Sequence, residues 1–251
     1  MVKGLDYFIN KFKGFEDCYT IIGGTACNVL MDETETPFRA TKDIDMILIM
    51  EARHKEFANT FWEFIEEGGY KCGWRNSDEV HFYRFTEPKK GYPSMIELFS
   101  RKPDYLPDAP AEIIPIYIDD YVSSLSAILL DDDFYNFMLS GRKTVSDICV
   151  LDAEHLIPFK MYAWLDLKKK KQEGKFVPER DIKKHKYDVF RLLQIVDTGL
   201  HIETTGLIRD SIVRFLNDIK SEEIPFDQLG IPFQMSDALR HLASLYVIPE
   251  L

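Results

Sequence analysis

The pattern of hydrophobic residues changes about half-way along the chain, and this change constrains the fold more than any other feature. In the first half, short apolar runs of strand length alternate with segments whose apolar residues recur at helical spacing. From Asp152 onward the pattern is helical. Strands interleaved with helices, followed by helices alone, predict an α/β core with a helical C-terminal part.

The predicted elements are short strands and amphipathic helices. The predicted strands are 19–22, 44–50, 80–85, 95–99 and 113–118. The predicted helices are 5–12, 25–31, 57–65, 156–171, 182–196, 207–219 and 237–246. The boundary is expected within 119–151, and we divide the chain into a core, 1–120, and a mainly helical part, 121–251.

Composition excludes several classes of protein. The 251 residues are 45% hydrophobic and carry a formal net charge of −11. No apolar run approaches the roughly 20 residues of a membrane helix, and no signal-like segment opens the chain, so we expect a cytoplasmic protein without membrane contact. The cysteines form no CxxC pair and are expected to be buried thiols; they are Cys18, Cys27, Cys72 and Cys149.

A glycine pair stands where a strand is expected to lead into a helix. Gly23-Gly24 follows the predicted strand 19–22, and the helical pattern starts at Thr25. Glycine lets a backbone approach a ligand closely, and the first N–H groups of a helix attract phosphate. The pair is interpreted either as a phosphate-binding turn or as a purely structural turn.

Two aspartates open the second predicted strand. Side chains two residues apart on a strand share a face, so Asp43 and Asp45 lie together while Ile44 points into the core. Neighbouring carboxylates repel each other unless a cation lies between them, and Mg²⁺ prefers such oxygen ligands. The pair is interpreted as a divalent-metal site or, alternatively, as two solvated aspartates.

Glu97 interrupts an otherwise apolar predicted strand, 95–99. Burying an unpaired charge is costly, so a carboxylate in this context calls for a partner. If this strand neighbours the Asp43/Asp45 strand, Glu97 completes a cluster of three carboxylates. The alternative is an edge-strand glutamate that faces water.

These features follow one another in a recognisable order. The order is Gly23-Gly24, Arg39-x-Thr41-x-Asp43-Ile44-Asp45, Glu97, and later Lys160-x-x-Ala163 and Asp188. It resembles the nucleotidyltransferase fold of the DNA polymerase β superfamily, and within it the AbiEii/AbiGii-type nucleotidyltransferases, many of which are toxins of bacterial toxin–antitoxin systems. The resemblance covers about residues 18–195. It implies a mixed sheet with flanking helices followed by the helical part.

The resemblance also implies an activity, the transfer of a nucleoside monophosphate from an NTP to a hydroxyl acceptor with Mg²⁺ or Mn²⁺. It assigns the metal ions to Asp43, Asp45 and Glu97, of which Glu97 also helps to deprotonate the acceptor. A cognate antitoxin protein is an implied partner.

Further residues are assigned to the nucleotide by the same resemblance. The residues expected at its phosphates are Gly23, Gly24, Thr25, Arg39 and Thr41. Lys160 is expected to neutralise charge that grows in the transition state, and Asp188 to position Lys160 or the nucleotide.

Two positions depart from the family pattern. Superfamily members often have a serine where this chain has Gly24, so a hydroxyl contact to phosphate is expected from Thr25. The downstream motif usually carries two acids three residues apart, whereas this chain has His185 and Asp188. The missing acid favours an alternative in which the chain is catalytically inactive and binds nucleotide or docks to a partner protein.

The acceptor stays open between RNA, a protein and a small molecule. Residues 168–186 hold eight lysines and Arg180 against three acidic residues, a net of +6, and Phe176 and Tyr187 could stack on bases. Such a run is also typical of a solvated helix end. The acidic charge of the whole chain suits a polycationic small molecule such as an aminoglycoside better than RNA.

Overall fold

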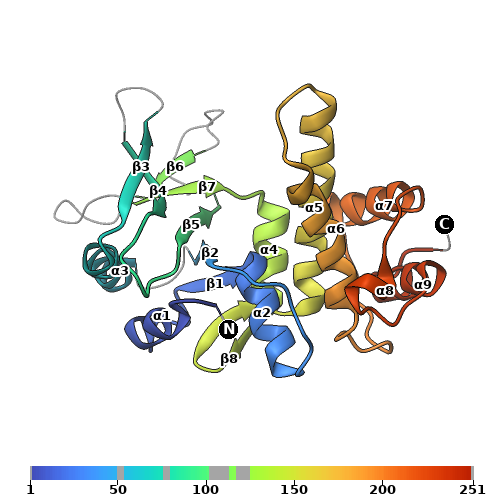
Figure 1. The fold of residues 1–251 in the computed structure, drawn as a ribbon, viewed down its shortest axis with the longest axis horizontal. Coiled ribbons are helices and arrows are strands. Elements are labelled where there is room, and N and C mark those ends of the chain that lie inside the picture. Colours follow the sequence, from blue (N-terminus) through green and yellow to red (C-terminus); the bar gives the residue numbers. More distant parts are fainter. Residues whose placement is uncertain (1, 50–53, 76–79, 102–112, 117–124, 250–251) are drawn as a thin grey trace. The chain divides into compact units, whose positions relative to one another are not determined.

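The structure is a computed structural model that describes residues 2–49, 54–75, 80–101, 113–116 and 125–249. The chain folds as two compact units, Met1–Asp152 and Ala153–Leu251 (Figure 1). The first is a mixed sheet flanked by helices and the second is helical, so the predicted fold class is confirmed.

Strands and helices alternate in the first unit. Its helices are α1 (Leu5–Phe12), α2 (Gly23–Glu33), α3 (His54–Gly68) and α4 (Asp132–Ser140). Its strands are β1 (Tyr19–Ile22), β2 (Asp43–Leu48), β3 (Lys71–Arg75), β4 (Val80–Thr86), β5 (Met95–Ser100), β6 (Ile113–Ile116), β7 (Leu125–Leu129), β8 (Arg142–Val145) and β9 (Ile148–Leu151).

The strands described join in one sheet with the order β3-β4-β5-β2-β1-β9-β8, and β7 pairs with both β5 and β6. The sheet is mixed because β2 runs antiparallel to β1 but parallel to β5. The strand that carries Asp43 and Asp45 therefore lies in the middle of the sheet, between the strand that leads to the glycine pair and the strand that carries Glu97.

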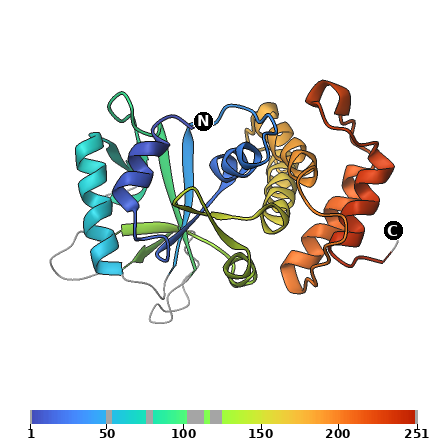
Figure 2. The ribbon, with the colours of Figure 1, turned by 90° about the horizontal axis from the view of Figure 1, so that it is seen from below.

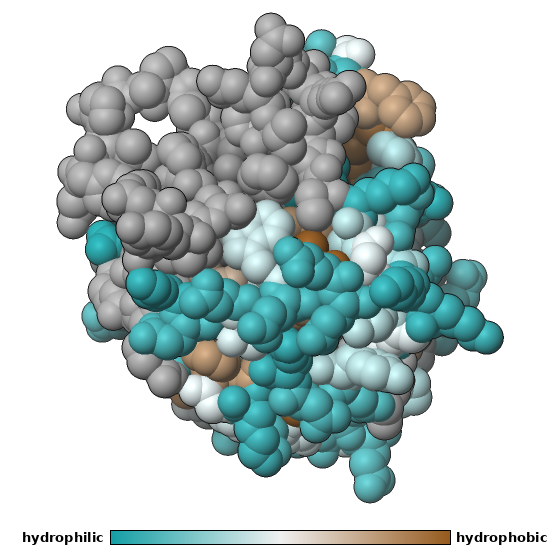
Figure 3. All heavy atoms as spheres, turned by 90° about the vertical axis from the view of Figure 1, so that its left-hand side faces the viewer, coloured by the Kyte–Doolittle hydropathy of each residue, from teal (hydrophilic) through white to brown (hydrophobic). Residues whose placement is uncertain are grey.

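Helices α1 and α3 cover one face of the sheet and α2 and α4 lie on the other (Figure 2). The core under α1 and α3 is aromatic: Phe12 packs against Phe61 and Phe64, and Phe61 packs edge-on against Phe85 of β4. Large apolar residues at helical spacing give α3 its buried side. Its other side is polar, and the described residues of this end of the molecule are mainly hydrophilic (Figure 3).

The second unit packs its helices around one aromatic centre. The helices are α5 (Ala153–Gln172), α6 (Glu179–Leu193), α7 (Gly206–Ile219), α8 (Phe226–Leu229) and α9 (Met235–Leu245). The ring of Trp164 on α5 meets Phe215 of α7 edge-on, and Phe190 of α6 also contacts Phe215. All three rings are fully buried.

The division between the units lies later than the predicted 120/121 boundary. Residues 125–151 contain α4 and three strands, and β7 and β9 pair with β5 and β1 of the sheet. This stretch therefore belongs to the first unit. Parts of two predicted strands, residue 50 and residues 117–118, lie outside the described residues.

Three cysteines whose side chains are described, Cys18, Cys27 and Cys149, are buried free thiols, as predicted. In the part of the chain that is described, no helix is both long and apolar enough to span a bilayer.

Candidate functional site

The register of the sheet brings Asp45 and Glu97 side by side. Asp45 on β2 pairs with Glu97 on β5, and Glu97 pairs in turn with Arg84 on β4. Neighbouring strands are about 4.8 Å apart, and paired side chains lie on the same face. We call Arg84, Glu97 and Asp45 the sheet row. Two of the three acids that were predicted to converge are therefore direct neighbours.

Asp43 lies on the same face as the sheet row. Asp43 and Asp45 are partly exposed, whereas Ile44 between them is fully buried. The alternation arises because successive side chains of a strand point to opposite faces, and the apolar face packs into the core. The two carboxylates thus face away from the core side on which Ile44 lies, as the sequence predicted.

The glycine pair at the start of α2 lies against these residues. Gly23 has φ +70°, and a Cβ there would lie 1.9 Å from Oδ2 of Asp45. A Cβ on Gly24 would lie 2.7 Å from Oγ1 of Thr41 and 3.4 Å from Nη2 of Arg39. A side chain at either glycine would force one of these neighbouring side chains to move, so the glycine turn, Arg39 and Thr41 lie close together next to Asp45.

Thr25 has a different role from the predicted one. Its side chain is fully buried, and its hydroxyl donates to the backbone carbonyl oxygen of Asp43 at 2.6 Å. The hydroxyl is used inside the protein, where it fixes α2 against β2, and does not supply the expected phosphate contact. The residue before α2 is Ile22, whose side chain makes no capping bond to the first N–H groups of the helix.

Arg84 is a residue of the site that sequence reasoning missed. Its Nε donates to Oε1 of Glu97 at 2.6 Å, and its Nη2 contacts the same oxygen. The strand of Arg84 was predicted, but its register against the strand of Glu97 was not. The signal was the carboxylate itself, because a glutamate flanked by apolar residues needs a cationic partner.

Lys160 and Asp188 are brought together within the second unit. Nζ of Lys160 on α5 lies 3.4 Å from Oδ2 of Asp188 on α6, and Nη1 of Arg191 lies 3.3 Å from its Oδ1. The exposed fractions of the side chains are 4% for Lys160 and 0% for Asp188. We call Lys160, Asp188 and Arg191 the helix cluster. Arg191 was also missed, although it follows Asp188 by one helical turn. His185 precedes Asp188 by one turn.

Most lysines of the basic stretch have acidic partners. Lys170 pairs with Asp166 at 2.7 Å, and Lys171 pairs with Glu179 at 2.5 Å. Lys168 and Lys186 both bind Glu222, at 3.1 and 2.8 Å. Lys169 and Lys175 both pair with Glu173, and Lys184 pairs with Asp181. Phe176, in the loop between α5 and α6, is 94% exposed.

The partners of Glu222 control its ionisation. Partial burial by itself would raise its pKa, but the hydrogen bonds and charges of Lys186 and Lys168 outweigh this effect. The pKa of Glu222 therefore lies below its ordinary value.

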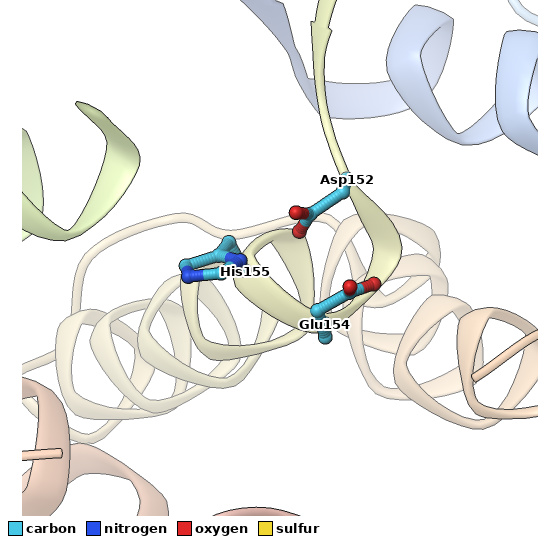
Figure 4. A group of neighbouring side chains, drawn as sticks. All are labelled: Asp152, Glu154 and His155. Carbon is cyan, nitrogen blue, oxygen red and sulfur yellow. The ribbon is translucent and has the colours of Figure 1, made fainter. Parts of the chain in front are cut away.

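A second group of potential metal ligands occurs where β9 leads into α5. Among the described residues, Asp152, Glu154 and His155 place one ligand atom each within 4.8 Å of one another (Figure 4). Asp43, Asp45 and Glu97, which are also described, do not form a group of this kind, and the carboxylate of Glu97 is bound by Arg84. Residues so close in sequence come together without help from the fold, and such groups commonly occur without an ion.

Comparison with known proteins adds no relative. No family model matches the chain, and no curated protein matches it.

Proposed function

We propose that this protein is a divalent-cation-dependent nucleotidyltransferase of the type that its motifs resemble, the AbiEii/AbiGii type. The observation that carries the proposal is the pairing of Asp45 with Glu97 across β2 and β5, beside a turn where Gly23 approaches the Asp45 carboxylate. Acids from distant parts of the sequence and a glycine turn at the start of a helix meet at one place.

The donor set suits a hard divalent cation. Asp43, Asp45 and Glu97 offer only carboxylate oxygens, the ligands that Mg²⁺ prefers. The Arg84 guanidinium binds one of these carboxylates, Glu97. Mg²⁺ or Mn²⁺ held by these residues would neutralise charge on the nucleotide phosphates and lower the pKa of the attacking hydroxyl.

The residues of the chain would divide the remaining work. The N–H groups at the start of α2 and the Arg39 guanidinium would bind the phosphates, as the positive end of a helix and a planar cation both do. Glu97, held in place by its strand, would accept the proton of the acceptor hydroxyl. The acceptor oxygen then bonds to the α-phosphorus, and the bond to the leaving pyrophosphate breaks.

The experiment uses the full chain with NTPs labelled at the α or at the γ phosphorus. Each NTP is incubated with Mg²⁺ or Mn²⁺ and with total RNA, a mixture of aminoglycosides, or the protein alone. We expect label from the α position to pass to one of these acceptors, and label from the γ position to pass to none. Transfer of the γ label would indicate a kinase and contradict the proposal.

Matched variants connect the activity to the site. We expect Asp45→Asn to lower transfer at least about 100-fold, equal to about 2.7 kcal/mol of transition-state stabilisation, because it removes a charged metal ligand and keeps the side-chain shape. Asp152→Asn, in the other ligand group, is the control and should retain activity. Transfer that survives Asp43→Asn and Asp45→Asn would refute the metal assignment.

One observation favours a second candidate, a non-catalytic nucleotide-binding or partner-docking module. Lys160, the expected transition-state cation, is buried in an ion pair with Asp188. The absence of any labelled product, combined with an NTP-dependent rise in melting temperature, would support nucleotide binding without transfer. Growth inhibition relieved by a co-expressed neighbouring protein would support the toxin assignment.

A further inference from the structure

The contact between Arg84 and Glu97 has a consequence for the metal chemistry. Glu97 is 13% exposed in its side chain, and both described contacts from Arg84 end on its Oε1. A carboxylate that binds a guanidinium through this oxygen has less negative charge to offer a metal ion. The guanidinium also carries a positive charge that repels a divalent cation nearby.

The two partners differ in how firmly they are held. Glu97 lies on β5 between β4 and β2, and its side chain is nearly buried. Arg84 lies on β4, and 45% of its side chain is exposed. A long arginine side chain with half its surface in water can reorient, whereas a short side chain in the middle of a sheet cannot move far. Of the two partners, the Arg84 side chain is therefore the one that can move away.

The register gives Arg84 a defined position relative to Asp45. Arg84, Glu97 and Asp45 lie at one level on three adjacent strands, and Glu97 is on the middle strand. A cation shared by Asp45 and Glu97 would draw on the charge of the same carboxylate that Arg84 binds. The guanidinium and the metal ion thus compete for one carboxylate.

We propose that Arg84 is the internal counter-ion of Glu97 and competes with the divalent cation for this carboxylate, so that Arg84 lowers the metal affinity of the site. The proposal rests on the proposed function, because that function assigns the metal to Asp43, Asp45 and Glu97. Arg84 is a positioning residue: without metal it holds Glu97, and cation binding displaces it. As a consequence, the divalent cation would bind mainly when a nucleotide is present, because the negative charge of its phosphates adds to that of the acids.

The test measures Mn²⁺ binding to the full chain without nucleotide, by the loss of the electron paramagnetic resonance signal of free Mn²⁺. We expect Arg84→Gln to bind Mn²⁺ about two- to five-fold more tightly than the wild type, since a half-exposed ion pair is lost as a competitor. Arg84→Lys should lie between the two, because an ammonium keeps the charge but not the planar fork.

Two further variants separate competition from a general effect of charge. Lys143→Gln removes a cation of the same exposure, 45%, that pairs with Glu33 on the same unit, and should leave Mn²⁺ affinity unchanged. The double variant Glu97→Gln/Arg84→Gln should lose the gain in Mn²⁺ affinity expected for Arg84→Gln alone. The proposal is overturned if Arg84→Gln binds Mn²⁺ as the wild type does, or if its gain persists without Glu97.

The outcomes distinguish this proposal from the proposed function. Tighter Mn²⁺ binding by Arg84→Gln, with no nucleotidyl transfer by any variant, would support the competition and contradict the enzyme. Transfer that depends on Asp45, with Mn²⁺ affinity unchanged in Arg84→Gln, would support the enzyme and contradict the competition. A melting curve for each variant verifies that it is folded.

Discussion

The sheet row and the helix cluster bring opposite charges together in two different ways. In the sheet row the acids outnumber the cation, and Arg84 is half-exposed. In the helix cluster two cations share Asp188, which is fully buried. An acidic and partly exposed arrangement can take up a cation, whereas removal of one partner from a buried ion pair leaves an uncompensated buried charge. Burial therefore separates the group suited to binding from the group suited to stability.

Removing the carboxylate of the helix cluster should have the largest effect on stability. Asp188→Ala leaves the buried ammonium of Lys160 without this counter-charge, and breaking a buried pair in this way costs about 3–5 kcal/mol. Urea denaturation of the full chain measures the loss, and hydrogen exchange of peptides from α6 assigns it to the helical unit.

An exposed ion pair on the same helix provides the control for this prediction. Asp181 pairs with Lys184 at 3.4 Å, and both side chains are partly exposed. Asp181→Ala should therefore cost about 1 kcal/mol or less. Equal losses for Asp181→Ala and Asp188→Ala would contradict the structural role of the helix cluster.

A smaller effect is expected where the glycine turn meets the sheet row. Gly23→Ala places a methyl group on the Asp45 carboxylate at a residue with φ +70°, whereas Gly14 has φ +88° and nothing within 4 Å. Gly14→Ala should cost about 1 kcal/mol for its backbone conformation alone. Gly23→Ala should lower the free energy of unfolding by at least about 1 kcal/mol more than Gly14→Ala does, because the new methyl group or the Asp45 carboxylate must also move.

Thermal or urea unfolding of both glycine variants measures this difference. The comparison removes the backbone contribution, because both residues have positive φ. If the two variants lose the same free energy of unfolding, Asp45 does not press against the turn, and the close approach at the site is refuted.

The smallest effect concerns pH and Glu222. Its pKa is lowered in the folded protein, so its ion pairs stabilise the helical unit above the unfolded pKa of about 4.3. This stability is lost as the pH falls through the lower folded pKa. The loss should be below about 1 kcal/mol, because the group is partly exposed.

Unfolding free energies measured between pH 6 and about pH 3 test this prediction. Glu222→Gln should remove this part of the pH dependence, and Glu223→Gln, at an exposed neighbour, should retain it. A pH profile unchanged by Glu222→Gln would show that Lys168 and Lys186 do not stabilise the unit through this carboxylate.

The sequence predicted the helices and strands in which hydrophobic residues recur with a clear helical or strand period. Phe57, Phe61 and Phe64 mark α3, and alternation around Ile44 marks β2. The stretch 125–151 was not resolved into α4 and its strands. Its strands β8 and β9 are four residues each; β9 joins the sheet by pairing with β1, more than a hundred residues earlier, and β8 pairs with β9. Short segments of this kind carry little periodicity of their own.

The sequence predicted that Asp43 and Asp45 share a face, but it did not predict the position of Arg84 beside Glu97. Asp43 and Asp45 share a face because of local strand geometry, which two residues of sequence suffice to show. Arg84 reaches Glu97 through strand register, and register depends on the whole sheet. The hydroxyl of Thr25 was misassigned because its acceptor is a backbone carbonyl, that of Asp43, which no side-chain pattern reveals.

The most direct measurement is a crystal structure of the full chain with Mn²⁺ and a non-hydrolysable NTP analogue, in which anomalous scattering locates the manganese. The account predicts manganese bound by Asp43, Asp45 and Glu97, with the phosphates at Gly23-Gly24 and Arg84 withdrawn from Glu97. Manganese at Asp152, Glu154 and His155 alone, or a nucleotide bound away from the glycine turn, would contradict it.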